Sequence, residues 1–250
     1  MMLKIILADE KRAGWAICCA MFADPLHLAF DPEIIWPGAR LLDKSQGRKR
    51  MIVKQIAIGY MDNFSYIIGC ENTRQALVID PGSNAEQLVS EAKKEILEIV
   101  TIVNTHGHGD HTAGNAALKA RTGATIIIHE LDGDRFPDAD VLLSSEKTLQ
   151  LGDIAFDVIH TPGHTPGGIC LHAMGNLFTG DTLFVGDSGR TDLVGGDRPT
   201  LGKSIRRLME LPDHTVVWPG HDYGPTPSST IGWEKRNNVN AKEYGYFVQD

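Results

Sequence analysis

The sequence predicts a mixed fold in two halves, in which two β-sheets pack against each other and helices lie on the outside. Between residues 51 and 128, three short β-type runs are followed by helical and strand patterns in alternation. From residue 154 onward, a second β-rich run begins and again ends in helical patterns. Two β-rich runs with interspersed helices favour layers of secondary structure around a hydrophobic core. The pattern alone leaves the class as α/β or α+β.

Five strands and two helices are expected in the first half. The strands are predicted at residues 52–58, 65–70, 76–80, 99–103 and 125–128. Ser83 or Asn84 can cap a helix. The apolar stripe of this helix is expected to consist of Leu88, Ala92 and Ile96. A second helix is predicted over residues 112–122, and Gly123 would end it.

The second half begins with a strand that has one exposed face, because Ile154, Phe156 and Val158 alternate with polar or small residues. The remaining strands are predicted at residues 169–172, 177–179 and 215–218. Pro199 suits the first turn of a helix. The buried side of that helix is expected to consist of Leu201, Ile205, Leu208 and Met209. A last helix is predicted over residues 228–240.

Composition and charge limit the class of protein and its partners. The chain has 250 residues, of which 42% are hydrophobic and 22% charged, which excludes a disordered chain and a disulfide-stapled miniprotein. The formal net charge is −8, which disfavours nucleic acid as a partner because its phosphates repel an acidic protein. No apolar run reaches the roughly 18–20 residues that a membrane helix needs, so no membrane partner is expected. The four cysteines form no C-x-x-C pair, and reduced thiols in the cytoplasm are therefore expected.

Residues 1–50 differ in character from the rest of the chain. They show no sustained hydrophobic period, whereas a strand pattern begins abruptly at Met51. Residues 13–23 are apolar like the core of a signal peptide, but Asp9 and Glu10 occupy the flank that should be positive. We therefore expect residues 1–50 to be a poorly ordered N-terminal extension or the product of a misassigned start codon. Residues 51–250 would form the folded domain.

Metal-ligating side chains are concentrated directly after a predicted buried strand. The segment THGHGDHTAGN, residues 105–115, contains His106, His108, Asp110 and His111. On an extended loop, residues two apart point the same way, so His106 and His108 can bind one ion. Asp110 and His111 would then face a neighbouring position. Imidazole and carboxylate are ligands that zinc and iron accept readily, so this segment predicts a metal site.

Three further ligand-type side chains each lie on a loop just past a predicted strand. His164 lies in TPGHTPGG, Asp181 in LFTGDTLF and His221 in VVWPGHDYG. Loops at strand ends are where sheet scaffolds present binding and catalytic residues. These three side chains are therefore expected to join the same site.

Taken together, these motifs resemble the metallo-β-lactamase superfamily. H-x-H-x-D-H is followed by a later His, Asp and His in similar contexts, and the resemblance extends from Met51 to about Asn240. TPGHTPGG, TGDTLF and GRTD are most similar to the glyoxalase II and persulfide dioxygenase branch. The resemblance implies an α+β fold, the αββα sandwich, in which two mixed β-sheets pack face to face with helices outside.

The resemblance also implies a binuclear metal site. Matched by position, one ion would be held by His106, His108 and His164, and the other by Asp110, His111 and His221. Asp181 would bridge both ions, and Asp110 and Asp181 would be the catalytic carboxylates. Two divalent ions are implied, with zinc favoured over iron or manganese. Two such ions lower the pKa of a bound water and polarise the carbonyl that the resulting hydroxide attacks.

Two reactions are compatible with this resemblance. The first is hydrolysis of a thioester such as a hydroxyacylglutathione by a metal-bound hydroxide. The second is oxidation of glutathione persulfide by one Fe(II) and O₂, with His106, His164 and Asp181 as the iron ligands. The segment GDSGRTDLVGGD resembles the dioxygenase branch. Seven ligand-type residues suit a binuclear hydrolase, but dioxygenases of this family retain them too. The hydrolase is the favoured hypothesis. Its expected partner is a small-molecule thioester or thiol substrate. A homodimer is compatible with the sequence.

Several residues beside the ligands are expected to support the site or to be structural. Arg190 and Tyr223 resemble positions that contact the thiol-bearing half of the substrate, although Arg190 could instead pair with a nearby aspartate. Asp80 is expected to orient a ligand from behind rather than to bind metal. The three histidines expected to be structural or exposed are His129, His160 and His172.

Overall fold

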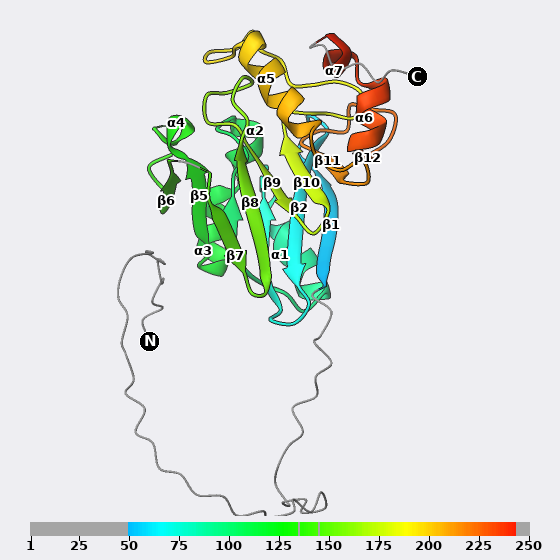
Figure 1. Ribbon diagram of the computed structural model, residues 1–250. Coiled ribbons are helices and arrows are strands. Elements are labelled where there is room, and N and C mark those ends of the chain that lie inside the picture. Colours follow the sequence, from blue (N-terminus) through cyan, green and yellow to red (C-terminus); the bar gives the residue numbers. More distant parts are fainter. Residues whose placement is uncertain (1–49, 135, 145, 244–250) are drawn as a thin grey trace, which may run out of the picture. The chain divides into compact units, whose positions relative to one another are not determined.

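The structure, a computed structural model, describes residues 50–134, 136–144 and 146–243. The expectation for the N-terminal extension therefore lies outside the described residues, apart from Arg50. In the described part, two six-stranded sheets pack face to face with helices outside them (Figure 1). This arrangement confirms the predicted α+β sandwich.

The first sheet follows the order of its strands in the chain. It consists of β1 (Met51–Ile58), β2 (Asn63–Cys70), β3 (Gln75–Ile79), β4 (Glu98–Val103), β5 (Thr125–His129) and β6 (Val141–Leu143). The strands β1, β2 and β3 pair antiparallel, and β3 to β6 pair parallel. Alternation along β2 turns Phe64, Tyr66 and Ile68 toward the other sheet and Ile67 toward the outer helices.

The second sheet is mostly antiparallel. It consists of β7 (Thr148–Leu151), β8 (Ile154–His160), β9 (Ile169–Ala173), β10 (Asn176–Gly180), β11 (Val216–Pro219) and β12 (Ser229–Thr230). Only the β10–β11 pair is parallel. As the alternating pattern predicts, Ile154, Phe156 and Val158 are buried between the sheets.

Helices cover the outer face of each sheet. On the first sheet, α1 (Ala85–Lys94) and α3 (Asn115–Thr122) bury Leu88 and Leu118. On the second, α5 (Arg198–Leu208) and α6 (Ile231–Asn237) bury Leu201, Ile205 and Ile231. Three short helices complete the fold, namely α2 (Gly109–Thr112), α4 (Glu130–Gly133) and α7 (Val239–Glu243). None of the described helices is long and apolar enough to cross a membrane.

The end of α1 differs from the prediction, because Ile96 does not belong to the apolar stripe. The helix ends at Lys94, and Ile96 adopts a left-handed φ of 55° with 78% of its surface exposed. Leu97 N–H donates to Ala92 O and Ile96 N–H to Lys93 O, which is the Schellman arrangement. Leu97 is therefore the buried residue, and a β-branched Ile occupies the position where glycine is usual.

Two predicted helices are interrupted. Of the helix predicted over residues 112–122, Thr112 belongs to α2 and residues 115–122 form α3, with a turn at residues 113–114 between them. A Cβ at Gly114 would lie 2.7 Å from Gly82 O, so the close approach of these two segments requires glycine there. The helix predicted over residues 228–240 begins instead with strand β12 and divides at Asn238, which has an extended backbone. Strands β6 and β7 and helix α4 were not predicted.

Candidate metal centre

Seven predicted ligand side chains converge at one end of the sandwich. Each lies just beyond a strand, after β4, β8, β10 or β11, or in the adjoining helix α2. The set consists of His106, His108, Asp110, His111, His164, Asp181 and His221. The structure thus brings together all seven residues that the sequence predicted as metal ligands.

The first cluster contains His106, His108 and His164. Their ligand atoms lie within 4.8 Å of one another, and His164 Nε2 lies 2.9 Å from His108 Nδ1. His106 Nε2 is buried without a hydrogen-bond partner. A buried polar atom is normally satisfied, so this nitrogen has the position of a ligand atom.

The second cluster contains Asp110, His111 and His221. His111 Nε2 lies 3.1 Å from His221 Nε2, and Asp110 Oδ2 lies 3.4 Å and 3.6 Å from these two nitrogens. Asn63 Nδ2 donates to Asp110 Oδ2 at 2.9 Å and so fixes the carboxylate. This cluster is a second complete donor set beside the first.

Asp181 lies between the clusters. Its Oδ2 is 3.4 Å from His164 Nε2 of the first cluster and 3.3 Å from His221 Nε2 of the second. Its Oδ1 lies 3.3 Å from His111 Nε2 and is buried without a hydrogen bond. Gly220 permits this position, because a Cβ there would lie only 2.4 Å from Asp181 Oδ1.

These separations fit bound cations. Zinc binds imidazole nitrogen at about 2.0–2.1 Å, so two ligand atoms of a tetrahedral site lie roughly 3.3 Å apart. The closest inter-residue contacts in both clusters are near this value, and two of the ligand atoms are unsatisfied. The clusters are therefore suited to divalent metal ions.

Hydrogen bonds behind the rings fix which nitrogen faces the clusters. The Nδ1–H group of His111 donates to Asp80 Oδ2, that of His164 to Arg190 O, and that of His221 to Met61 O. Thr105 Oγ1 accepts in the same way from His106 Nδ1–H. These bonds leave the Nε2 lone pairs directed inward, as metal ligands require. His108 differs, since its Nδ1 faces the cluster.

Asp80 supports the centre from below. It follows β3 with a left-handed φ of 48°, which an aspartate tolerates better than most residues. Its Oδ1 accepts from Thr105 N–H at 2.7 Å, and its Oδ2 accepts from the Thr105 hydroxyl and from His111. The carboxylate thus holds the start of the ligand loop and one ring, as the sequence led us to expect.

Burial and charge act in opposite directions on the ionisable groups. Burial alone would raise the pKa of Asp181, but the charge of His111, together with the other neighbouring histidines, outweighs it and holds this pKa well below the ordinary value. Burial lowers the pKa of His106 well below its ordinary range. Burial also opposes the charge on His111, but Asp181 and Asp80 prevail and raise its pKa to about 9. Asp181 is therefore a carboxylate and His106 a neutral imidazole at neutral pH.

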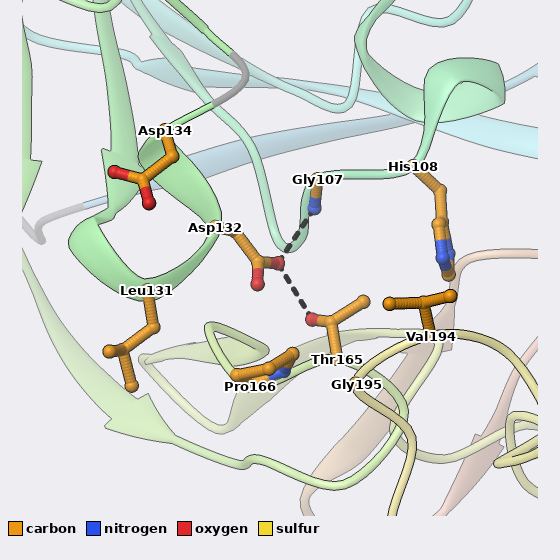
Figure 2. A pocket seen from close by; sticks show the side chains of 9 residues that line it. All are labelled: Gly107, His108, Leu131, Asp132, Asp134, Thr165, Pro166, Val194 and Gly195. Carbon is orange, nitrogen blue, oxygen red and sulfur yellow. Dashed lines mark hydrogen bonds between the residues drawn. The ribbon is translucent and has the colours of Figure 1, made fainter.

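Asp132, which sequence reasoning missed, joins the two loops that carry the first cluster. Its Oδ2 accepts from Gly107 N–H at 2.8 Å and from the Thr165 hydroxyl at 2.7 Å (Figure 2). Its Oδ1 accepts from Gly167 N–H at 2.8 Å. One carboxylate on α4 therefore ties the His106–His108 loop to the loop of His164.

Replacing Asp132 with alanine is expected to weaken metal binding at the first cluster by about 10- to 100-fold, the usual cost of losing a group that supports metal ligands. The second cluster depends on Asp80, Asn63 and Met61 and is expected to keep its affinity. Metal titration against a competing chelator would resolve the two sites. Asp134→Ala is the matched control, because this carboxylate lines the same cavity without a hydrogen bond to either loop. Equal losses at both clusters would contradict the assignment.

The two predicted substrate-side residues line a cavity above the metal centre. This cavity of about 420 Å³ is also lined by Met61, Phe184 and Leu193. Tyr223 stacks on His221, with ring centroids 4.6 Å apart, and its hydroxyl donates to Met61 O. Arg190 forms a two-point ion pair with Asp192 at 2.6 Å, so the alternative pairing with a nearby aspartate is also realised. Both residues remain proposals for substrate contact.

The other predicted histidines lie outside the clusters. His129 and His160 stack on each other with ring centroids 4.3 Å apart. His160 Nε2 donates to Pro166 O at 2.9 Å and so contacts the loop that carries His164. His172 is half-buried on β9.

Comparison with known proteins agrees with this geometry. A family model described as the metallo-beta-lactamase superfamily matches residues 59–221. An uncharacterized protein of Aquifex aeolicus is 38% identical over 213 residues, which are 77% of this chain and 98% of the relative. A hydroxyacylglutathione hydrolase of Polaromonas sp. is 38% identical over 178 residues, or 69% of this chain and 67% of the relative. The crystal structure of ETHE1 from Myxococcus xanthus has a TM-score of 0.71 and 35% identity, covering 75% of this chain and 83% of that one.

Proposed function

Because the chain belongs to the metallo-beta-lactamase superfamily, we propose that it is a metal-dependent hydrolase that cleaves a small-molecule thioester of the hydroxyacylglutathione class. The observation that carries this proposal is the pair of donor clusters with Asp181 between them. We assign His106, His108 and His164 to one ion and Asp110, His111 and His221 to the other. Zinc is the favoured metal, with iron or manganese as alternatives.

Two divalent ions, when bound, supply hydroxide at neutral pH and neutralise the charge that develops on the carbonyl oxygen. The protein's own contribution is to keep the ligands in place. Asp181 faces both clusters, and the Nδ1–H bonds of His111, His164 and His221 hold the rings. Met61, Phe184 and Leu193 supply the apolar wall against which a substrate would lie.

The cavity favours a leaving group that needs no proton. Apart from the metal ligands, its ionisable lining residues in the described part of the chain are Asp187, Arg190 and Tyr223. Burial and the charge of Asp181 raise the pKa of Tyr223, so this phenol is a poor acid. A thiol has a pKa of about 8.5 and can leave as thiolate, whereas an amine or alkoxide leaving group requires a proton donor. This difference supports a thioester over an amide or ester.

The second candidate function is the oxidation of a thiol persulfide by O₂ at one Fe(II). It is supported by the resemblance of the GDSGRTDLVGGD segment, which includes Arg190. Its three ligands would be His106, His164 and Asp181. Asp181 Oδ2 lies 3.9 Å from His106 Nε2 and 3.4 Å from His164 Nε2. The second cluster suits a binuclear hydrolase, but the dioxygenase branch retains the same ligand residues. The preference for the hydrolase therefore rests on the relatives named hydroxyacylglutathione hydrolase.

Metal analysis combined with two activity assays tests the proposal. Protein purified without chelator is expected to contain two metal ions per chain and to hydrolyse S-lactoylglutathione. The same preparation is expected to consume no O₂ in the presence of glutathione persulfide. One iron per chain together with O₂ uptake would replace the hydrolase with the dioxygenase. His106→Ala is the control for both assays, since unchanged activity in this variant would show that the metal centre does not act in catalysis.

A further inference from the structure

A second, smaller cavity adjoins the metal centre on the other side of His108. It has a volume of about 190 Å³ and is lined by His108, Leu131, Thr165 and Val194, among others (Figure 2). His108 also lines the larger cavity. The loop that follows Arg190 separates the two, because Leu193 lines the larger cavity and its neighbour Val194 the smaller. Among the described residues, His108 is thus the one ligand of the first metal cluster that lines both cavities.

Apolar side chains stand exposed around the smaller cavity. Val194 is 84% and Leu131 55% exposed, and Figure 2 shows them on either side of Thr165 and Pro166. Large apolar side chains gain free energy when a ligand covers them. Val194 lies beyond β10 and Leu131 lies in α4. Two separate segments therefore each contribute an exposed apolar side chain to the edge of the same cavity.

The polar groups in the wall are already engaged. Both oxygens of Asp132 accept hydrogen bonds from Gly107, Thr165 and Gly167. The Thr165 hydroxyl is used as a donor in the same network. The remaining carboxylate, Asp134, disfavours an anionic group. The cavity therefore disfavours anions, and its apolar surface is contributed by Leu131, Pro166 and Val194.

We infer that this cavity binds the acyl arm of the thioester, and that this arm is an apolar chain. The inference rests on the proposed hydrolase function. A thioester has two arms that diverge from one carbonyl carbon, and the structure has two cavities that share one metal ligand, His108, in their walls. Arg190 and Tyr223 line the larger cavity and resemble residues that contact the thiol-bearing half. The smaller cavity is left for the acyl half. A persulfide has no such second arm, so the cavity would have no occupant in the dioxygenase reaction.

A series of thioesters with one thiol and increasing acyl length tests this assignment. The metal-loaded protein would be assayed with S-acetyl-, S-butanoyl- and S-hexanoylglutathione. We expect kcat/KM to rise by up to about fourfold for each methylene, the ratio that corresponds to burying a methylene group at ~0.8 kcal/mol. In Val194→Asp and in Leu131→Asp, the ratio of hexanoyl to acetyl kcat/KM is expected to fall toward one. Both side chains are exposed, so the fold should be retained, and circular dichroism and metal content would verify this.

Met174→Asp is the matched control. Met174 is also an exposed apolar residue, but it lies in the turn between β9 and β10 and lines neither cavity. The control should keep the chain-length dependence of the parent. Hydrolysis without any dependence on acyl length would overturn the acyl-arm assignment and leave the hydrolase intact. A dependence that survives in Val194→Asp and Leu131→Asp would do the same. Failure to hydrolyse any of these thioesters by a preparation that hydrolyses S-lactoylglutathione would overturn the acyl-arm assignment alone. Failure with S-lactoylglutathione as well would overturn the hydrolase.

Discussion

Asp181→Asn is expected to lower kcat/KM for thioester hydrolysis by about three orders of magnitude or more. The carboxylate lies 3.3–3.4 Å from His164 and His221, one from each cluster, and is the negative charge that both clusters share. The amide keeps the shape but loses this charge, and its NH₂ group would face imidazole lone pairs. Metal ions supply several kcal/mol of transition-state stabilisation, and about 4 kcal/mol corresponds to 10³-fold in rate. Steady-state kinetics with metal analysis of the same samples would measure both effects.

Asp153→Asn is the matched control for this variant. Asp153 is also a carboxylate next to a strand, but it lies in the β7–β8 turn, at the opposite end of β8 from the loop of His164. It accepts a hydrogen bond from Asn72 there. Its activity should stay within about twofold of the parent, as is usual for a surface substitution. An Asp181→Asn variant that keeps more than a tenth of the parent activity would contradict the bridging role.

The metal ligands could be predicted because each lies next to a strand in the sequence. A strand fixes where its own last residue lies, so His164, Asp181 and His221 are placed by the ends of β8, β10 and β11. Once these strands share a sheet, their ends meet. The glycine-rich H-x-H-x-D-H segment supplies the other four ligands within one loop. Both signals are local, which is why one sequence was sufficient.

The groups that support the ligands could not be predicted in the same way. Asn63 reaches Asp110 across 47 residues, and Asp132 reaches Gly167 across 35. The carbonyls of Met61 and Arg190 fix His221 and His164, and a backbone carbonyl has no sequence signature at all. These contacts depend on tertiary packing, which no local pattern encodes.

The predicted helix boundaries were wrong for a related reason. Periodicity alone assigned Ile96 to the buried stripe of α1, although the neighbouring Leu97 takes that place. The Schellman hydrogen bonds that end the helix compete with the preference of a β-branched residue, and the burial of Leu97 decides the outcome. The turn at residues 113–114, between α2 and α3, lies where the segment at Gly82 packs closely against Gly114.

Metal removal is expected to lower the melting temperature, and the loss should increase as the pH rises from about 6.5 to 9. In the metal-free protein, Asp181 and Asp80 overcome the effect of burial and raise the pKa of His111 to about 9, above the unfolded value of about 6.5. A raised folded pKa stabilises the metal-free fold fully below pH 6.5, and this contribution disappears as the pH rises through 9. The whole rise in the pKa of His111 corresponds to about 3 kcal/mol of unfolding free energy.

Bound metal changes this dependence because it takes the place of the proton on His111. Metal affinity should therefore increase over the pH range in which the metal-free fold becomes less stable. The pKa of His221 is also raised, since Asp181 outweighs its burial, so it contributes with the same sign. The lowered pKa of His106 acts only below pH 6.5, where its unfolded form gains a proton.

Thermal denaturation at pH 6.5, 7.5 and 9, with zinc and after treatment with a chelator, measures the effect. The difference in melting temperature between the two samples should widen at each step. Asp80→Asn removes one of the charges that raise the pKa of His111 and should reduce the widening. A metal-free melting temperature that stays constant or rises between pH 6.5 and 9 would show that His111 carries no stabilising proton. In that case the hydrogen bond from His111 to Asp80 would orient a neutral ring only.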